Sequence, residues 1–181
     1  MELATFTTTG DRWSASGAAT PADKGMFVKE LEQALLDGRA DLAVHSAKDL
    51  PTELPEGLAV LAVPARADAR DVLVGVPGGA DALTPGMRIG TGSPRREAQL
   101  RSAFPGVEVI AVRGNVGTRL GRLDEADVDG VVLAAAGLAR LGLSPDDAHA
   151  LAPDVCTPAA GQGALALEGR AGDARVAGIV A

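Results

Sequence analysis

Short apolar runs alternate along this chain with stretches of helical spacing, and this alternation limits its possible folds more than any other feature. Strands that alternate with helices form mainly parallel sheets with helices on their faces. The apolar runs predict strands over residues 3–8, 42–45, 58–63, 71–76, 88–91, 107–112, 130–133 and 163–168. The helical spacing predicts helices over residues 26–37, 94–103, 115–123, 134–141 and 173–180. The expected fold class is therefore α/β.

Two stretches are predicted to cross between two lobes. One covers residues 64–70, and the other, rich in proline and alanine, covers residues 152–161. Two crossings return the late strand to the first lobe. We therefore expect one lobe to comprise residues 1–65 and 162–181, and the other to comprise residues 66–161.

Composition excludes several classes of function. The 181 residues carry a net charge of −7 and one cysteine, and no block is rich in lysine or arginine, which argues against general nucleic-acid binding. No run of about eighteen apolar residues indicates a membrane span. The first residues lack the basic and apolar segments of a secretory signal, and a single cysteine cannot form an internal disulfide. We expect a cytoplasmic protein with neither a nucleic-acid nor a membrane partner.

Polar side chains follow the apolar run at residues 42–44 directly. They are His45, Ser46, Lys48 and Asp49, after which Pro51 ends the element. The pattern predicts a buried strand with polar residues at its carboxyl end, where ligands bind in open α/β sheets. A cation beside a carboxylate there is typical of an anion holder next to a proton donor or acceptor. The alternative is a surface turn with a solvated Lys–Asp pair, and His45 is interpreted as structural.

Two arginines occupy the first turn of the helix predicted over residues 94–103. Ser93 is the expected N-cap and Pro94 the first helical residue. Arg95 and Arg96 therefore lie where the helix dipole disfavours cations. Such a conflict is expected where an external anion completes the arrangement, and the alternative is a solvated pair.

Further polar residues follow later strands. Arg113 comes after the strand at residues 107–112, and Asn115 and Arg119 share one face of the next helix. Arg140 lies near a helix C-terminus, where a cation is favourable without any ligand. Gln162, between two glycines, is either a donor to a ligand or part of a hinge.

Six segments, in their order and separations, resemble the porphobilinogen deaminase (hydroxymethylbilane synthase) family: residues 24–32, 44–51, 90–96, 113–120, 136–142 and 158–164. The resemblance covers nearly the whole chain. It implies two periplasmic-binding-protein-like lobes joined by a double hinge. It also implies a transferase of tetrapyrrole (haem and chlorophyll) biosynthesis, which condenses four porphobilinogen units, with loss of ammonia, to linear hydroxymethylbilane.

The same resemblance implies roles for individual residues. Asp49 matches the family's single catalytic aspartate, which would assist ammonia loss and stabilise the positive charge that develops. The residues implied to bind substrate, growing chain or dipyrromethane cofactor are Lys24, Phe27, Ser46, Lys48, Thr91, Ser93, Arg95, Arg96, Arg113, Asn115, Arg119, Arg140 and Gln162. The implied partners are porphobilinogen and the oligopyrrole chain, and the family is usually monomeric.

Two parts of the family's pattern have no match here. One is a first strand with an Arg-x-Ser-x-Leu-Ala motif and its helix; the other is a C-terminal α+β domain whose Gly-Gly-Cys segment anchors dipyrromethane as a thioether. We therefore expect a chain truncated at both ends, without the attachment cysteine, to which a separate polypeptide could supply the missing domain. Cys156 lacks those neighbours and is predicted to be a small, semi-buried residue of the second crossing. No Cys/His spacing indicates a metal.

Two functions remain open from the sequence. Asp49 and Lys48 favour the transferase. The absent cofactor cysteine favours an inactive or non-catalytic two-lobed module that binds small anions such as carboxylates. Asp23, where the family usually has glycine, is expected to weaken anion binding near Lys24. An exported solute-binding protein is disfavoured by the lack of a signal sequence.

Overall fold

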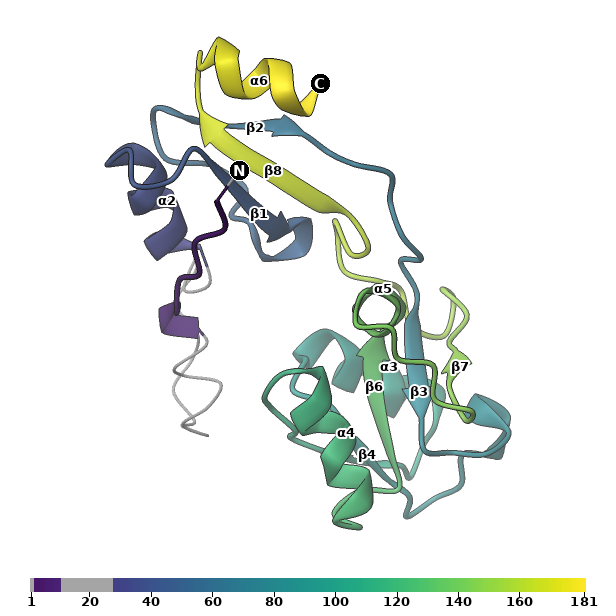
Figure 1. Ribbon diagram of the computed structural model, residues 1–181. Helices are drawn as coiled ribbons and strands as arrows, with labels where there is room; N and C mark the ends of the chain where they lie inside the picture. Colours follow the sequence, from purple (N-terminus) through teal and green to yellow (C-terminus); the bar gives the residue numbers. More distant parts are fainter. Residues whose placement is uncertain (1, 11–27) are drawn as a thin grey trace. The chain divides into compact units, whose positions relative to one another are not determined.

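The computed structural model describes residues 2–10 and 28–181, which form two compact units (Figure 1). Unit 1 consists of the described residues up to Arg66 together with Ala164–Ala181, and unit 2 consists of Ala67–Gly163. The chain therefore enters unit 2 after Arg66 and leaves it after Gly163. The predictions made for residues 11–27, including those for Lys24 and Phe27, lie outside the described residues.

Unit 1 is built on a three-stranded sheet in the order β1-β8-β2, and both strand pairs are antiparallel. The strands are β1 (Leu42–Ser46), β2 (Leu58–Ala62) and β8 (Leu165–Arg170). Helix α2 (Lys29–Leu36) packs against all three strands, and α6 (Ala174–Val180) packs against β2 (Figure 1). Leu35, Ala43 and Leu58 form the buried core between α2 and the sheet.

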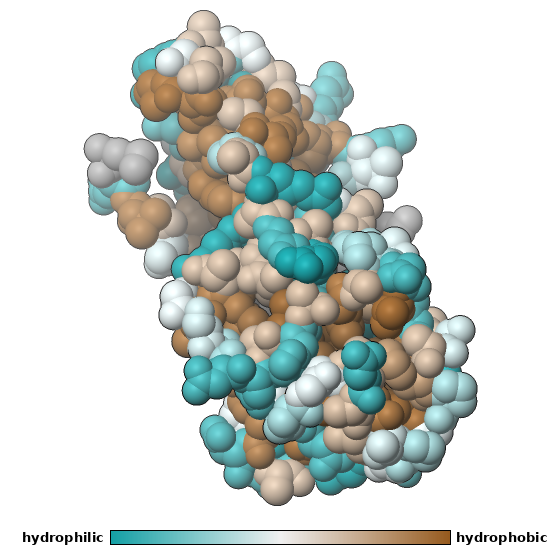
Figure 2. Space-filling model, turned by 90° about the vertical axis from the view of Figure 1, so that its right-hand side faces the viewer, coloured by the Kyte–Doolittle hydropathy of each residue, from teal (hydrophilic) through white to brown (hydrophobic). Residues whose placement is uncertain are grey.

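Two predictions for unit 1 are corrected. Residues 3–8 form no strand, and Leu3 is 88% exposed; their weak alternation reflects no strand pairing. Strand β1 is buried on one face only: Ala43 and His45 face inward, whereas Val44 is 57% exposed. Val60 of the neighbouring part of the sheet is exposed as well. Figure 2 shows brown, apolar residues on the visible surface of unit 1. The apolar run at residues 42–44 thus comes from a half-covered strand, because α2 covers one face.

Unit 2 is built on a five-stranded sheet in the order β5-β4-β6-β3-β7. Its strands are β3 (Asp71–Val74), β4 (Arg88–Gly90), β5 (Glu108–Ile110), β6 (Gly130–Ala134) and β7 (His149–Ala150). Its helices are α3 (Pro94–Ala103), α4 (Val116–Asp124) and α5 (Ala135–Arg140). The two-residue strand β7 was not predicted from the sequence, and His149 is half-buried in it.

Helices cover both faces of this sheet. One apolar cluster joins Leu73 and Ile89 to Leu100 of α3. The other joins Val72 and Val74 of the same strand to side chains of α4 and α5. Consecutive residues of β3 thus alternate between two cores, which is the two-residue period of a strand buried on both faces.

The unit 1 sheet is antiparallel and the unit 2 sheet is mixed, which corrects the expectation of mainly parallel sheets. Strands β4, β5 and β6 are parallel neighbours, whereas β3 runs antiparallel to both β6 and β7. Strand β3 follows the crossing into unit 2 and β8 follows the return crossing. Each of these two strands runs against its sheet neighbours. None of the helices in residues 2–10 and 28–181 is long and apolar enough to cross a membrane.

Candidate functional site

The carboxyl ends of β4, β5 and β6 meet at one edge of the unit 2 sheet, because these three strands are parallel neighbours. The turns after β4 and β5, together with the helices α3, α4 and α5 that follow the three strands, carry most of the predicted binding residues. The turns after β4 and β5 approach closely at Gly92, where a Cβ atom would lie 2.7 Å from the carbonyl oxygen of Val112. Glycine is therefore required at this position for the two turns to pack together.

Two predicted binding residues cap helices. The Ser93 hydroxyl accepts from the backbone N–H of Arg96 at 3.4 Å, and Pro94 is the first residue of α3, which confirms the predicted cap. The Asn115 side-chain oxygen accepts from the N–H of Thr118 at 2.8 Å and so caps α4. Thr91 is buried, and its hydroxyl accepts from the N–H of Ser93 at 3.2 Å.

The anion that lies between Arg95 and Arg96 belongs to the protein itself. Asp71, the first residue of β3, is fully buried. Its Oδ2 lies 2.8 Å from Nη1 of Arg95, and its Oδ1 accepts from Nη2 and Nε of Arg96 at 2.7 and 3.0 Å. Arg96 is only 4% exposed, so the alternative of a solvated pair is wrong.

The ion pairs keep Asp71 charged. Burial of the carboxyl raises its pKa, but the hydrogen bonds and charges of Arg95 and Arg96, together with Gln162, outweigh burial and hold the pKa below its ordinary value. Asp71 was expected in a strand, and no functional role was predicted for it. The signal was an acid that opens an apolar strand, since a carboxylate in such a place needs buried cations.

Arg119 lies close enough to Arg96 to respond to its charge. Burial of the guanidinium, and then the charge of Arg96, lower the pKa of Arg119. Its Nε donates to the carbonyl of Gly114 at 2.7 Å, and it contacts no carboxylate among the described residues. An anionic ligand gains the most binding free energy at a partly buried cation that has no carboxylate partner.

Arg140 and Gln162 contact the return crossing. Arg140 Nη2 donates to the carbonyl of Gly163 at 2.7 Å. Gln162 is buried, and its Nε2 donates to the carbonyl of Ala69 at 2.6 Å and to Asp71 at 2.9 Å. Gly163 has φ +86°, and a Cβ there would lie 2.5 Å from the carbonyl of Ala67, so this crossing needs glycine. Gln162 thus joins the crossing to Asp71.

In unit 1, Lys48 and Asp49 lie in a short 3₁₀ turn, Ala47–Asp49, that follows β1 directly. Ser46 and Asp49 border a hollow of about 210 Å³, whose other walls include Phe6, Val28 and Leu31. Desolvation by its surroundings raises the pKa of the Asp49 carboxyl, and the charges of Lys48 and His45 oppose this shift without cancelling it. A carboxyl whose pKa is raised keeps its proton to higher pH than an ordinary carboxyl, which suits it to proton exchange with a ligand.

Cys156 is a core residue of unit 2, which corrects the expectation of a semi-buried residue in a crossing. It is fully buried against Leu73, Ile89 and Leu100. Its Sγ donates to Asp71 Oδ2 at 3.3 Å. Burial and the neighbouring carboxylate raise the pKa of the thiol to about 11, so it is a poor nucleophile.

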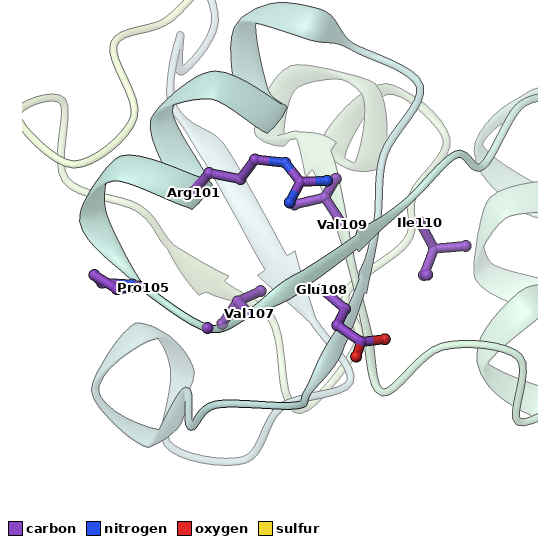
Figure 3. Close-up of a pocket in the computed structure, with 7 residues that line it drawn as sticks. Arg101, Pro105, Val107, Glu108, Val109 and Ile110 are labelled. Atoms are coloured by element: carbon purple, nitrogen blue, oxygen red, sulfur yellow. The ribbon is translucent and has the colours of Figure 1, made fainter.

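Another hollow, of about 530 Å³, lies in unit 2, and none of the predicted site residues lines it. It follows the edge strand β5 and the end of α3, and its walls include Arg101, Pro105 and Glu108. Figure 3 shows Arg101 reaching from α3 toward Val109, while Glu108 points away. Arg101 is paired with Glu97 on its own helix, so this open groove offers no convergent polar groups.

Sequence comparisons match nearly the whole chain to one family. The family model described as "Porphobilinogen deaminase, dipyromethane cofactor binding domain" matches residues 1–178. The porphobilinogen deaminase of Syntrophotalea carbinolica is 50% identical over 180 residues, covering 99% of this chain and 57% of its own length. That of Chromobacterium violaceum is 50% identical over 182 residues, covering 100% of this chain and 59% of its own. The chain thus spans less than two thirds of these relatives.

Solved structures share the fold. The second substrate-binding domain of a putative amino acid ABC transporter from Streptococcus pneumoniae superposes with a TM-score of 0.55 at 12% identity, over 89% of this chain and 70% of that one. A periplasmic binding protein from Brucella ovis gives a TM-score of 0.50 at 19% identity, over 89% of this chain and 51% of that one. The predicted α/β fold of the periplasmic-binding-protein type is thereby confirmed.

Proposed function

The chain belongs to the porphobilinogen deaminase family, and on that premise we propose that it supplies the catalytic and dipyrromethane-binding region of a hydroxymethylbilane synthase. Such an enzyme joins four porphobilinogen units, with loss of ammonia at each step. The observation that carries the proposal is the group of Arg95, Arg96 and Arg119 at the carboxyl edge of the unit 2 sheet. Porphobilinogen and its oligomers carry acetate and propionate arms, which need such cations.

The donors of this group fit carboxylate ligands. Of the three side-chain nitrogens of Arg95, only Nη1 donates to another described residue, so Nε and Nη2 remain for a ligand. Arg119 keeps both terminal nitrogens in the same way. Planar guanidinium groups match carboxylates with two parallel hydrogen bonds. These two arginines, with Arg113 and Lys48, are the residues that we assign to the carboxylate arms of substrate and growing chain.

Asp49 is proposed as the group that handles the proton and positive charge. Loss of ammonia from porphobilinogen leaves a cationic methylene-pyrrolenine. A carboxylate stabilises this cation, and a carboxyl with a raised pKa can also protonate the departing amine. Ser46, at the end of β1, borders the same hollow as Asp49 and is assigned to substrate contact.

The same arginines suit the acidic arms of dipyrromethane, which would supply the pyrrole unit that begins the chain. Cys156 is not assigned to its attachment, because the thiol is fully buried, donates to Asp71 and has a raised pKa. We also propose that units 1 and 2 are the two lobes of the family. The unit boundaries after Arg66 and Gly163 fall within two residues of the predicted ones, which supports this assignment.

A chimera tests the proposed function. Residues 1–178 would replace the matching region of the Syntrophotalea carbinolica relative, and the product would be assayed with porphobilinogen. We expect turnover, and we expect Arg119→Gln to lower kcat/KM by about a hundredfold, since one charge-assisted contact is lost. Arg122→Gln is the matched control on the same helix, because Arg122 is paired with Glu125 and Asp127 at the surface.

The outcomes separate the transferase from its alternative. A folded chimera that binds porphobilinogen without converting it would support a non-catalytic anion-binding module. Equal losses in Arg119→Gln and Arg122→Gln would remove the arginine group from the site.

A further inference from the structure

Asp71 receives more hydrogen bonds than a buried carboxylate needs to hold a strand end. Five donors converge on its two oxygens: three from Arg95 and Arg96, one from Gln162 and one from the Cys156 thiol. The residue is fully buried. The charges of the two guanidinium groups exceed that of the carboxylate, so the group as a whole stays positive.

The arginines have acceptors that do not depend on Asp71. Arg96 Nη1 donates to the carbonyl of Val132 at 2.9 Å, and Arg95 Nη1 donates to the carbonyl of Thr157. Gln99, on the same helix as Arg95, also binds the Thr157 backbone, with contacts of 2.8 and 3.2 Å. These backbone contacts would keep both guanidinium groups in place if the carboxylate lost its charge.

Because the arginines do not need Asp71 to stay in place, the main effect of its charge is on how strongly they bind a ligand. We propose that Asp71 is a positioning residue and the internal counter-ion of this anion site, and that it holds down the affinity of Arg95 and Arg96 for anions. Any ligand carboxylate or phosphate at Arg95 competes with Asp71 for the same cation. An anion held too tightly would not leave, so the counter-ion favours release. That the natural anion is an oligopyrrole carboxylate rests on the proposed function; the counter-ion role does not.

The surroundings distinguish this role from a purely structural one. A residue that only stabilises the fold would change the free energy of unfolding when replaced and leave anion affinity as it was. A counter-ion changes the potential at the ligand, because charges a few ångströms apart in a partly buried site interact strongly. Arg119, whose pKa responds to the charge of Arg96, lies within this same field.

Titration of inorganic phosphate into the 181-residue chain at low ionic strength tests the proposal. Asp71→Asn keeps the size of the side chain and one acceptor oxygen but removes the charge. We expect its dissociation constant for phosphate to fall by about tenfold. Asp81→Asn is the control, since it removes the same charge from an exposed position of unit 2 and should leave the constant within about twofold.

Loss of the carboxylate also leaves the buried Arg96 and the half-buried Arg95 unneutralised, so the same step is repeated in a second background. In Arg96→Gln one of those cations is absent, and adding Asp71→Asn should again tighten phosphate binding by about tenfold. Arg119→Gln should weaken phosphate binding, which assigns the bound ion to this edge of the sheet.

Unchanged or weaker phosphate binding on Asp71→Asn in both backgrounds would show that Asp71 serves the fold alone and would overturn the proposal. Absence of phosphate binding in every variant, or binding that ignores Arg119→Gln, would overturn it as well. Because phosphate replaces porphobilinogen in this experiment, an inactive chimera would remove the proposed function without deciding the role of Asp71.

Discussion

His45 Nε2 lies 2.8 Å from Glu168 Oε2, and the two side chains are buried between the unit 1 sheet and α2. They sit on neighbouring antiparallel strands, with His45 of β1 opposite Ala166 and two residues from Glu168 along β8. A third polar side chain, Glu32 of α2, is only 7% exposed and senses the charge of both. Unit 1 therefore buries two acids against one histidine, close to the turn that carries Asp49.

His45→Phe should destabilise unit 1 by about 3 kcal/mol, because it leaves Glu168 buried without its partner. Urea unfolding, followed by hydrogen exchange of the β1 and β8 amides, measures this change. Replacing both residues, with His45→Phe and Glu168→Met, should recover most of the loss, since neither member of the pair is then buried without the other. Val44→Ala, at the exposed neighbour, should cost less than about 1 kcal/mol. A similar loss in the single and double variants would rule out the pair as its cause.

Because the pKa of Glu32 is raised, we expect unit 1 to lose stability as pH rises. Burial, followed by the charge of Glu168, raises the pKa of Glu32 above its ordinary value of 4.5, while His45 and Lys29 oppose the shift. A carboxyl with a raised pKa stabilises the fold below its unfolded value, and this contribution is lost as pH rises through the folded value. Stability measured upward from pH 4.5 should fall. Glu32→Gln should flatten this part of the curve, and an unchanged slope would exclude Glu32 as the group responsible.

Because the pKa of Asp71 is lowered, we expect the stability of unit 2 to fall as pH falls, the opposite of unit 1. Its pKa is held below the ordinary value of 3.8, because Arg95 and Arg96 outweigh the effect of burial. Its contribution is complete above 3.8 and is lost as pH falls through the folded value. Acid titration, with hydrogen exchange of Val72–Val74 as the probe, should show unit 2 losing protection below that pH. In Asp71→Asn this acid-dependent loss should be absent, and its persistence would assign it to other carboxyls.

Local patterns predicted most elements of both units, because the signals that set them lie within a few residues. Ser93 and Pro94 fixed the start of α3 to the residue. Such local signals could not predict the strand directions. Strands β3 and β8 run antiparallel to their neighbours because of the route of the chain between units. The strand predicted over residues 3–8 failed for a related reason, since alternation alone does not supply a pairing partner.

The sequence predicted the cations of the candidate site, but it did not predict the carboxylate that lies between them. Arg95 and Arg96 were expected to be strained by the helix dipole until a ligand arrived. The carboxylate that relieves them comes from Asp71, which is 24 and 25 residues away in sequence and reaches them only through the pairing of β3 with β6. Buried pairs of this kind depend on strand order, which no local spacing encodes. The same holds for His45, whose partner is at residue 168.

Asp49→Asn provides the sharpest test of the catalytic assignment. Asparagine keeps the shape of the side chain in its turn after β1, but it carries no negative charge and exchanges no proton in the relevant range. In the chimera we expect kcat to fall by at least about a thousandfold, equivalent to about 4 kcal/mol of lost transition-state stabilisation. Porphobilinogen binding should persist, since the carboxylate arms are assigned to arginine and lysine side chains. Glu53→Gln, an exposed acid four positions along the chain, is the control for loss of one charge nearby. Turnover of Asp49→Asn within about tenfold of the parent chimera would mean that another group handles the departing ammonia.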